Sequence, residues 1–156
     1  MKTKLKVTVL VAAVFLITGF AVTESSHPQT RAKLVGTWIV YMDHLPDVPP
    51  LLFTFHQDGT LIGSVPGDCA SNAHGVWKKV SPRTYNCTQM SYVFGENCKI
   101  TYIQKANFRI VVSKDGMSSK FEVWMQTMLP DGTVVKEITE TDTAVRMTVE
   151  PYQPPY

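Results

Sequence analysis

The chain has 156 residues, with 15 Lys and Arg against 13 Asp and Glu, so its formal net charge is +2 at pH 7. This length predicts one domain. The near-neutral charge, without a basic stripe or an acidic tract, argues against nucleic acid or a polycation as a partner.

The N-terminus has the pattern of an export signal. A basic head with three lysines precedes the uncharged apolar run 7–20, and Gly19 and Ala21 are the small residues typical of a cleavage site. We expect residues 1–21 to be a cleaved signal peptide, 22–33 a linker, and the mature protein secreted or periplasmic. The alternative is an uncleaved membrane anchor, although the run is short for a spanning helix of roughly 20 residues.

From residue 34 onward the chain predicts strands, with no convincing helical periodicity. Asp-Gly pairs at positions 58, 115 and 131 are typical of the turns between such strands. The predicted strands are residues 34–42, 51–57, 60–66, 74–80, 83–94, 98–112, 118–129 and 133–149. We expect the last strand to be broken by a bulge near Thr141 and Asp142.

Consecutive strands with short connections predict an all-β fold, an eight-stranded antiparallel up-and-down β-barrel over residues 34–150. A Pro-rich tail follows at 151–156. Because the chain alternates direction, the longer loops 43–50 and 67–73 fall at the same end. We therefore expect one loop-rich, open end and one end closed by tight turns.

The segment Gly36-Thr37-Trp38 in the first strand, together with Arg146 in the last, resembles the lipocalin and wider calycin superfamily. The resemblance implies that Trp38 packs across the closed end and that Arg146 lies over its ring, in a cation–π contact. Gly36 is expected to belong to the same closure. The Thr-Asp-Tyr motif and the C-terminal helix of lipocalins are missing from the pattern. The turns look more like those of small, exported, lipocalin-like bacterial proteins.

Aromatic residues in the strands are candidates either to line a ligand cavity or to fill the barrel. They are Phe53, Phe55, Trp77, Tyr85, Tyr102, Phe108 and Phe121. An eight-stranded barrel is just wide enough to be packed with side chains or to hold one small ligand. We expect binding of a small apolar or amphipathic molecule without catalysis. The alternatives are a cyclase or isomerase that uses the cavity, as in barrels of the allene oxide cyclase kind, and an interaction protein with a packed barrel.

Polar candidates for chemistry are few. Asp43, His44 and Asp47 share the first long loop, where they mark the mouth, a weak metal site or simply a solvated loop. His56 and His74 are expected at opposite ends of the barrel, which argues against a catalytic pair. On this pattern we assign no catalytic residue, metal or cofactor.

The three cysteines are Cys69, Cys87 and Cys98. The alternation of strand direction places Cys69 and Cys98 at the open end and Cys87 in mid-strand. Since a disulfide needs Cα atoms within about 7 Å, we predict a Cys69–Cys98 bond, with Cys87 a free and unreactive thiol. The triplet beginning at Asn86 also fits the N-glycosylation pattern, for which a chance match is the alternative.

Overall fold

The computed structural model describes residues 32–64 and 69–151. The predicted signal peptide, most of the linker and most of the Pro-rich tail lie outside these residues. Within the described ranges, no helix is long and apolar enough to cross a membrane.

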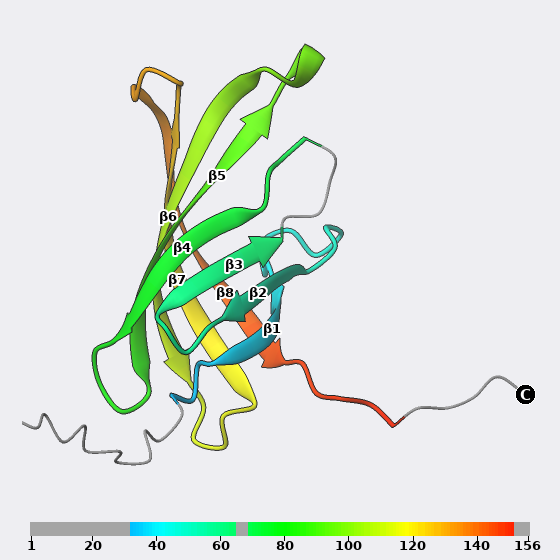
Figure 1. Cartoon of the computed structure of the whole chain (residues 1–156), viewed down its shortest axis with the longest axis vertical. Coiled ribbons are helices and arrows are strands. Elements are labelled where there is room, and N and C mark those ends of the chain that lie inside the picture. Colours follow the sequence, from blue (N-terminus) through cyan, green and yellow to red (C-terminus); the bar gives the residue numbers. More distant parts are fainter. Residues whose placement is uncertain (1–31, 65–68, 152–156) are drawn as a thin grey trace, which may run out of the picture.

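The described chain forms one closed antiparallel β-barrel in which each strand pairs with the next and β1 pairs with β8 (Figure 1). The predicted eight-stranded up-and-down barrel is thereby confirmed. The elements are β1 (Gly36–Tyr41), β2 (Leu51–Phe55), β3 (Thr60–Ser64), β4 (Ala73–Lys79), β5 (Thr84–Phe94), the short 3₁₀ turn η1 (Glu96–Cys98), β6 (Ile100–Val112), β7 (Ser118–Met128) and β8 (Val134–Arg146).

The last strand corrects one prediction. β8 runs unbroken through Thr141 and Asp142, which pair with Glu122 and Phe121 of β7. The predicted bulge at that point is therefore wrong, and the register shift of this pair lies between Thr127 and Met128. The reason is that an acidic side chain on the inner face interrupts the apolar alternation but not the hydrogen-bond ladder of the backbone.

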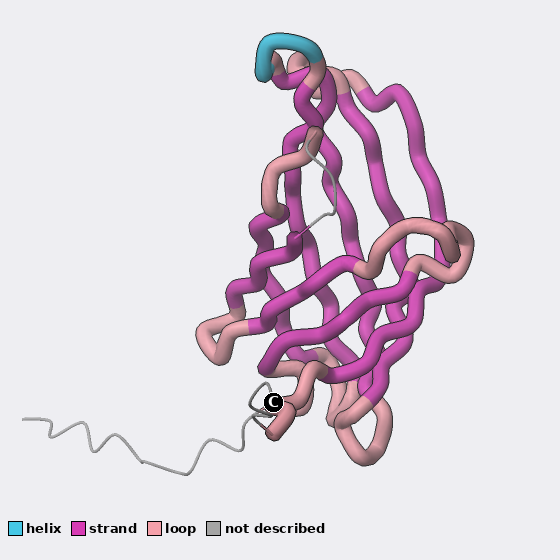
Figure 2. The backbone as a smooth tube through the Cα atoms, turned by 90° about the vertical axis from the view of Figure 1, so that its right-hand side faces the viewer, coloured by secondary structure: helices cyan, strands magenta, loops and turns pink. Residues whose placement is uncertain are grey.

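The two halves of the barrel differ in height. β1 to β4 are 5 to 7 residues long, whereas β5 to β8 are 11 to 13 residues long. The β5–β6 and β7–β8 hairpins consequently project beyond the shorter strands at the loop-rich end (Figures 1 and 2). At the loop-rich end the barrel wall is therefore low along β1 to β4 and high along β5 to β8.

The opposite end is closed by Trp38 and Arg146, which face each other in the β1–β8 register. The Trp38 side chain is fully buried, and its Nε1 donates to the carbonyl oxygen of Leu34 at 2.8 Å. The guanidinium carbon of Arg146 lies 4.5 Å from the centroid of the indole ring. Arg146 also donates to the carbonyl oxygens of Gly116 at 2.7 Å and Val35 at 2.8 Å. A cation–π contact and backbone carbonyls thus surround this charge.

Gly36 makes room for that guanidinium. Its φ of 134° is a conformation that residues with a Cβ rarely adopt. A Cβ at this position would lie 2.5 Å from Nη1 of Arg146. The structure therefore brings Gly36, Trp38 and Arg146 together at the closed end, in one interdependent arrangement.

Candidate functional site

A cavity of about 330 Å³ opens at the loop-rich end, between the β1–β2 loop and the long strands. Most of its wall is apolar. The lining residues are Met42, His44, Leu45, Val48, Leu51, Phe53, Gln89, Ser91, Gln104, Ala106, Phe108, Val123, Met125, Lys136, Ile138, Glu140 and Asp142. The volume is at the lower end of the roughly 300–1,000 Å³ typical of small-molecule pockets.

Of the seven aromatic candidates, Phe53 and Phe108 line this cavity. Their rings meet edge to face, with centroids 5.7 Å apart, at its inner end. Both side chains are buried, and they separate the cavity from the packed lower half of the barrel. They therefore form the apolar floor of the site.

The other aromatic candidates lie elsewhere. Phe55, Tyr85 and Phe121 are fully buried among the side chains of the closed half. Trp77 packs on Tyr85 with ring centroids 5.6 Å apart and donates from Nε1 to the carbonyl oxygen of His56. Tyr102 is 37% exposed and lies near the β5–β6 turn, where it pairs with Val93. These five aromatic residues are absent from the cavity lining.

One side of the cavity carries uncharged polar groups. Gln89 and Ser91 of β5 are buried and line the cavity beside Gln104 of β6. The side-chain oxygen Oε1 of Gln89 has no hydrogen-bond partner among the described residues. A buried acceptor without a partner is costly, so this oxygen favours a ligand that donates a hydrogen bond.

The opposite side of the cavity is charged, and it belongs to β8. Because side chains alternate along a strand, Arg146 and the buried Ala144 place Asp142 and Glu140 on the same inner face. Our sequence analysis missed both carboxylates. The signal was present in the sequence: counting back in steps of two from Arg146 leads to them directly.

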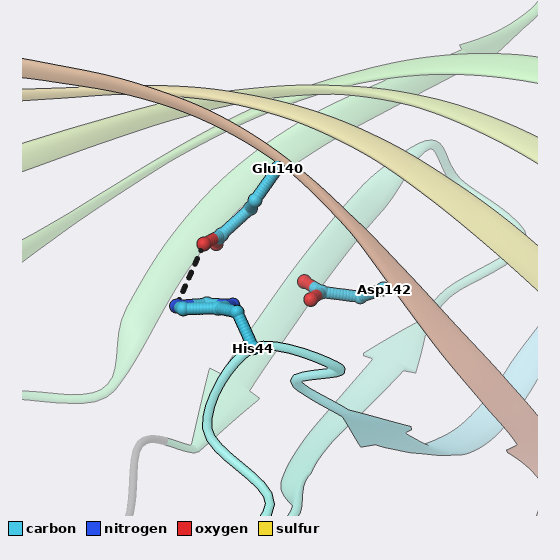
Figure 3. Close-up of side chains that lie close together, drawn as sticks. All are labelled: His44, Glu140 and Asp142. Carbon is cyan, nitrogen blue, oxygen red and sulfur yellow. Dashed lines mark ion pairs between the residues drawn. The ribbon is translucent and has the colours of Figure 1, made fainter.

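Glu140 and Asp142 converge with His44 of the β1–β2 loop (Figure 3). The Nε2 atom of His44 lies 3.0 Å from Oε2 of Glu140. The side chain of Asp142 points from β8 toward the same imidazole (Figure 3). One nitrogen or oxygen atom from each of the three side chains lies within 4.8 Å of the other two. We call these residues the rim triad.

The loop that carries His44 is fastened to β8 beside the triad. Thr143 Oγ1 donates a hydrogen bond to Oδ1 of Asp43 at 3.0 Å. The backbone N–H of Asp43 is near enough to the Asp142 carboxylate to act on it in the direction of a lower pKa. Asp43 therefore has a positioning role in the structure, whereas Asp47, the third polar residue of the predicted cluster, is exposed and outside the triad.

Asp142 is the buried member of the triad, with 3% of its surface exposed. Burial raises the pKa of its carboxyl group to about 6, and the negative charge of Glu140 acts in the same direction. Its Oδ1 has no hydrogen-bond partner within the part of the chain that the structure describes. At neutral pH the site therefore holds a buried carboxylate that lacks a full set of partners.

The remaining sequence candidates lie outside the cavity. His56 and His74 are both exposed, and neither lines the cavity.

The predicted Cys69–Cys98 disulfide is wrong, because the structure brings no pair of cysteines within disulfide distance and all three are free. Cys69 lies beside the end of β5, where its carbonyl oxygen accepts from the Phe94 N–H, whereas Cys98 is the last residue of η1, the turn between β5 and β6. Cys87 is buried, and burial raises the pKa of its thiol.

No family model matches the chain, and neither a curated protein nor a solved structure matches it. The closed barrel fits a lipocalin-like fold. Since a shared architecture hosts many functions, the function has to be argued from the cavity and its side chains.

Proposed function

We propose that this protein binds a small amphipathic molecule in the open end of the barrel. The apolar part of the molecule lies against Phe53, Phe108, Val123 and Met125, and its polar end donates a hydrogen bond to Gln89. The export signal expected at the N-terminus makes this a secreted or periplasmic binding protein.

The observation that carries the proposal is a cavity of about 330 Å³ with an apolar floor, lined by two residues with unpartnered buried acceptors, Gln89 and Asp142. A ligand pocket of this kind is mostly apolar, with a few placed polar groups that orient the occupant. A barrel built only for stability fills its interior with side chains, and the packed-barrel alternative has no role for this space.

The charges at the mouth narrow the class of ligand. Glu140, Asp142 and Gln89 line the cavity, and so does Lys136, a cation on the same strand as the two carboxylates. Beside Asp142 and Glu140 a carboxylate head group would meet two like charges, so this part of the cavity favours an uncharged donor such as an alcohol or an amide. The small volume favours a compact molecule over a long-chain lipid.

The test is displacement of a lipophilic fluorescent probe from the purified protein, in the presence of a metal chelator. We expect medium-chain alcohols to displace the probe better than carboxylates of the same chain length. Ala106→Phe, which fills the inner wall, is expected to weaken probe binding at least about tenfold. Val135→Phe, on the exposed outer side of β8, is the matched control and leaves binding unchanged.

Two results would contradict the proposal. One is the absence of probe binding to the folded wild-type protein. The other is equal binding by wild type and Ala106→Phe, which places the probe on the outer surface.

One observation favours a second function, proton-transfer catalysis by a cyclase or isomerase. Asp142 presents to the cavity a carboxyl group whose pKa is about 6, within the range useful for general acid–base chemistry. Recovery of the occupant after prolonged incubation, followed by chromatography and NMR spectroscopy, separates the two functions, because an isomer has the same mass as its precursor: a binding protein returns its occupant with unchanged structure. Conversion of an occupant by wild type but not by Asp142→Asn would favour catalysis.

A further inference from the structure

We propose that the rim triad of His44, Glu140 and Asp142 is a binding site for a divalent transition-metal ion, with Zn²⁺ bound more tightly than Mn²⁺. This inference rests on the triad alone and does not depend on the occupant proposed for the cavity.

The geometry of the triad is close to that of a metal site. Two atoms that each lie about 2.1 Å from one ion are at most about 4.2 Å apart. The three donor atoms already lie within 4.8 Å of one another. Small side-chain rotations therefore bring them around one ion, without movement of the strands.

Asp142 supplies a second and independent argument. Its side chain is almost fully buried, its Oδ1 has no partner among the described residues, and it points toward His44 (Figure 3). Burying a carboxylate without a full set of partners is unfavourable, and coordination of a cation is one of the ways in which proteins compensate for it. An apolar residue would serve this position better if stability alone were involved.

The identities of the side chains select the class of ion. One imidazole nitrogen and two carboxylates suit Zn²⁺ and Mn²⁺, whereas Mg²⁺ and Ca²⁺ prefer sites made only of oxygen. The usual order of affinities places Zn²⁺ above Mn²⁺. Three protein ligands leave at least one coordination position open. Because all three residues line the cavity, water or a donor atom of a bound molecule can occupy that position.

The structure also holds the ligands in place before any metal binds. The hydrogen bond from Thr143 to Asp43 fastens the β1–β2 loop to β8, one residue before His44 and one residue after Asp142. Supporting contacts of this kind orient metal ligands and raise the affinity of a site. A bound ion would join the loop to the strand a second time, and it is therefore expected to stabilise the fold.

The test is isothermal titration calorimetry of the full chain, without an affinity tag, with ZnCl₂, MnCl₂ and MgCl₂ in turn. Cys69→Ser and Cys98→Ser are introduced first, because exposed thiols bind zinc adventitiously. We expect one Zn²⁺ per chain, weaker Mn²⁺ binding, and Mg²⁺ binding weaker still. His44→Gln, Glu140→Gln and Asp142→Asn are each expected to weaken Zn²⁺ binding at least about tenfold.

Matched controls separate this site from the rest of the surface. His74→Gln and Asp47→Asn change exposed residues of the same types outside the triad, and they leave the affinity unchanged. Circular dichroism establishes that each variant is folded. If Asp142→Asn unfolds, Glu140→Gln, at the more accessible edge, decides the question alone.

Three outcomes would overturn the proposal. They are no Zn²⁺ binding by the wild-type chain, equal affinity in folded wild type and folded triad variants, and a loss of affinity in the His74→Gln control as large as that in His44→Gln. Cobalt substitution gives an independent readout: d–d absorption without a thiolate charge-transfer band supports the nitrogen and oxygen ligands, and a thiolate band contradicts them.

Discussion

β8 places charged side chains on one inner face both at the closed end of the barrel and beside the cavity, yet their surroundings differ. At the closed end, Arg146 is surrounded by the Trp38 ring and by backbone carbonyls. At the open end, four residues earlier, Asp142 has an oxygen without a partner beside an accessible cavity. The fold thus supplies partners for the charge of Arg146, whereas the carboxylate of Asp142 lacks a complete set.

This difference bears on the role of each end. A buried charge is tolerated when hydrogen bonds and opposite charges replace the water that it loses. The closed end provides such contacts to Arg146, so the charge of Arg146 helps to hold the barrel closed. Tyr85 Oη and Ser119 Oγ also have no partner among the described residues, but of the unpartnered groups only Asp142 and Gln89 belong to the cavity lining, so their compensation is expected from a ligand. We therefore expect the closed end to contribute most to stability and the open end to carry the proposed binding site.

The largest effect is expected from Trp38→Ala at the closed end. This change removes a fully buried ring together with the surface on which Arg146 lies, and we expect a loss of about 3–5 kcal/mol in the free energy of unfolding. Urea denaturation measures it. Trp124→Ala, which removes an indole that is 40% exposed on the outer face, serves as the control and is expected to cost far less. Similar losses in both variants would contradict the closure.

Gly36→Ala tests the same end with a single methyl group. The new Cβ would meet Nη1 of Arg146 on a backbone whose φ is 134°. We expect a loss of about 2 kcal/mol, because both the contact and the backbone conformation are unfavourable. The control is Gly132→Ala, whose φ of 90° carries the backbone strain but whose Cβ would meet no atom within 4 Å. If the two variants lose equal stability, the contact with Arg146 is unimportant.

The closed end was the more predictable of the two. Asp-Gly turns and apolar alternation act locally, so they indicated the strands and the direction in which each one runs. Trp38 and Arg146 followed from that direction together with a family resemblance. In the structure the two residues face each other across the β1–β8 pair.

The open end was less predictable, because its features depend on contacts between distant segments. His44 belongs to a loop whose position is set by the bond between Thr143 and Asp43, and no local pattern shows that bond. Tyr102 is separated by an even number of residues from the buried Ala106 and Phe108 of β6, so alternation predicts that it faces inward. It is nevertheless exposed, because it lies near the tip of the β5–β6 hairpin. The η1 turn, with positive φ at Asn97 and Cys98, holds Cys98 in a turn, whereas the sequence predicted that it begins the strand 98–112. Asp142 was the exception, since alternation alone would have placed it inside.

The smallest effect, and the one that compares the two ends most directly, is expected from Asp142→Asn in metal-free protein. The pKa of this carboxyl group is raised from 3.8 to about 6 in the folded chain. Stability linked to a raised carboxyl pKa is fully present below the unfolded value and is lost as the pH rises through the folded value. The wild type should therefore lose stability relative to the variant between about pH 4 and pH 7.

Since solvent at the cavity mouth screens part of the effect, we expect Asp142→Asn to be about 1–2 kcal/mol more stable than wild type at pH 8 and nearly equal to it at pH 4. Urea denaturation at pH 4, 6 and 8 with a chelator measures this, and Asp47→Asn in the exposed loop is the control. A variant that is less stable than wild type at pH 8 would mean that the carboxylate already has adequate partners. The two charges on the inner face of β8 would then be alike, because Asp142 would have as complete a set of partners as Arg146.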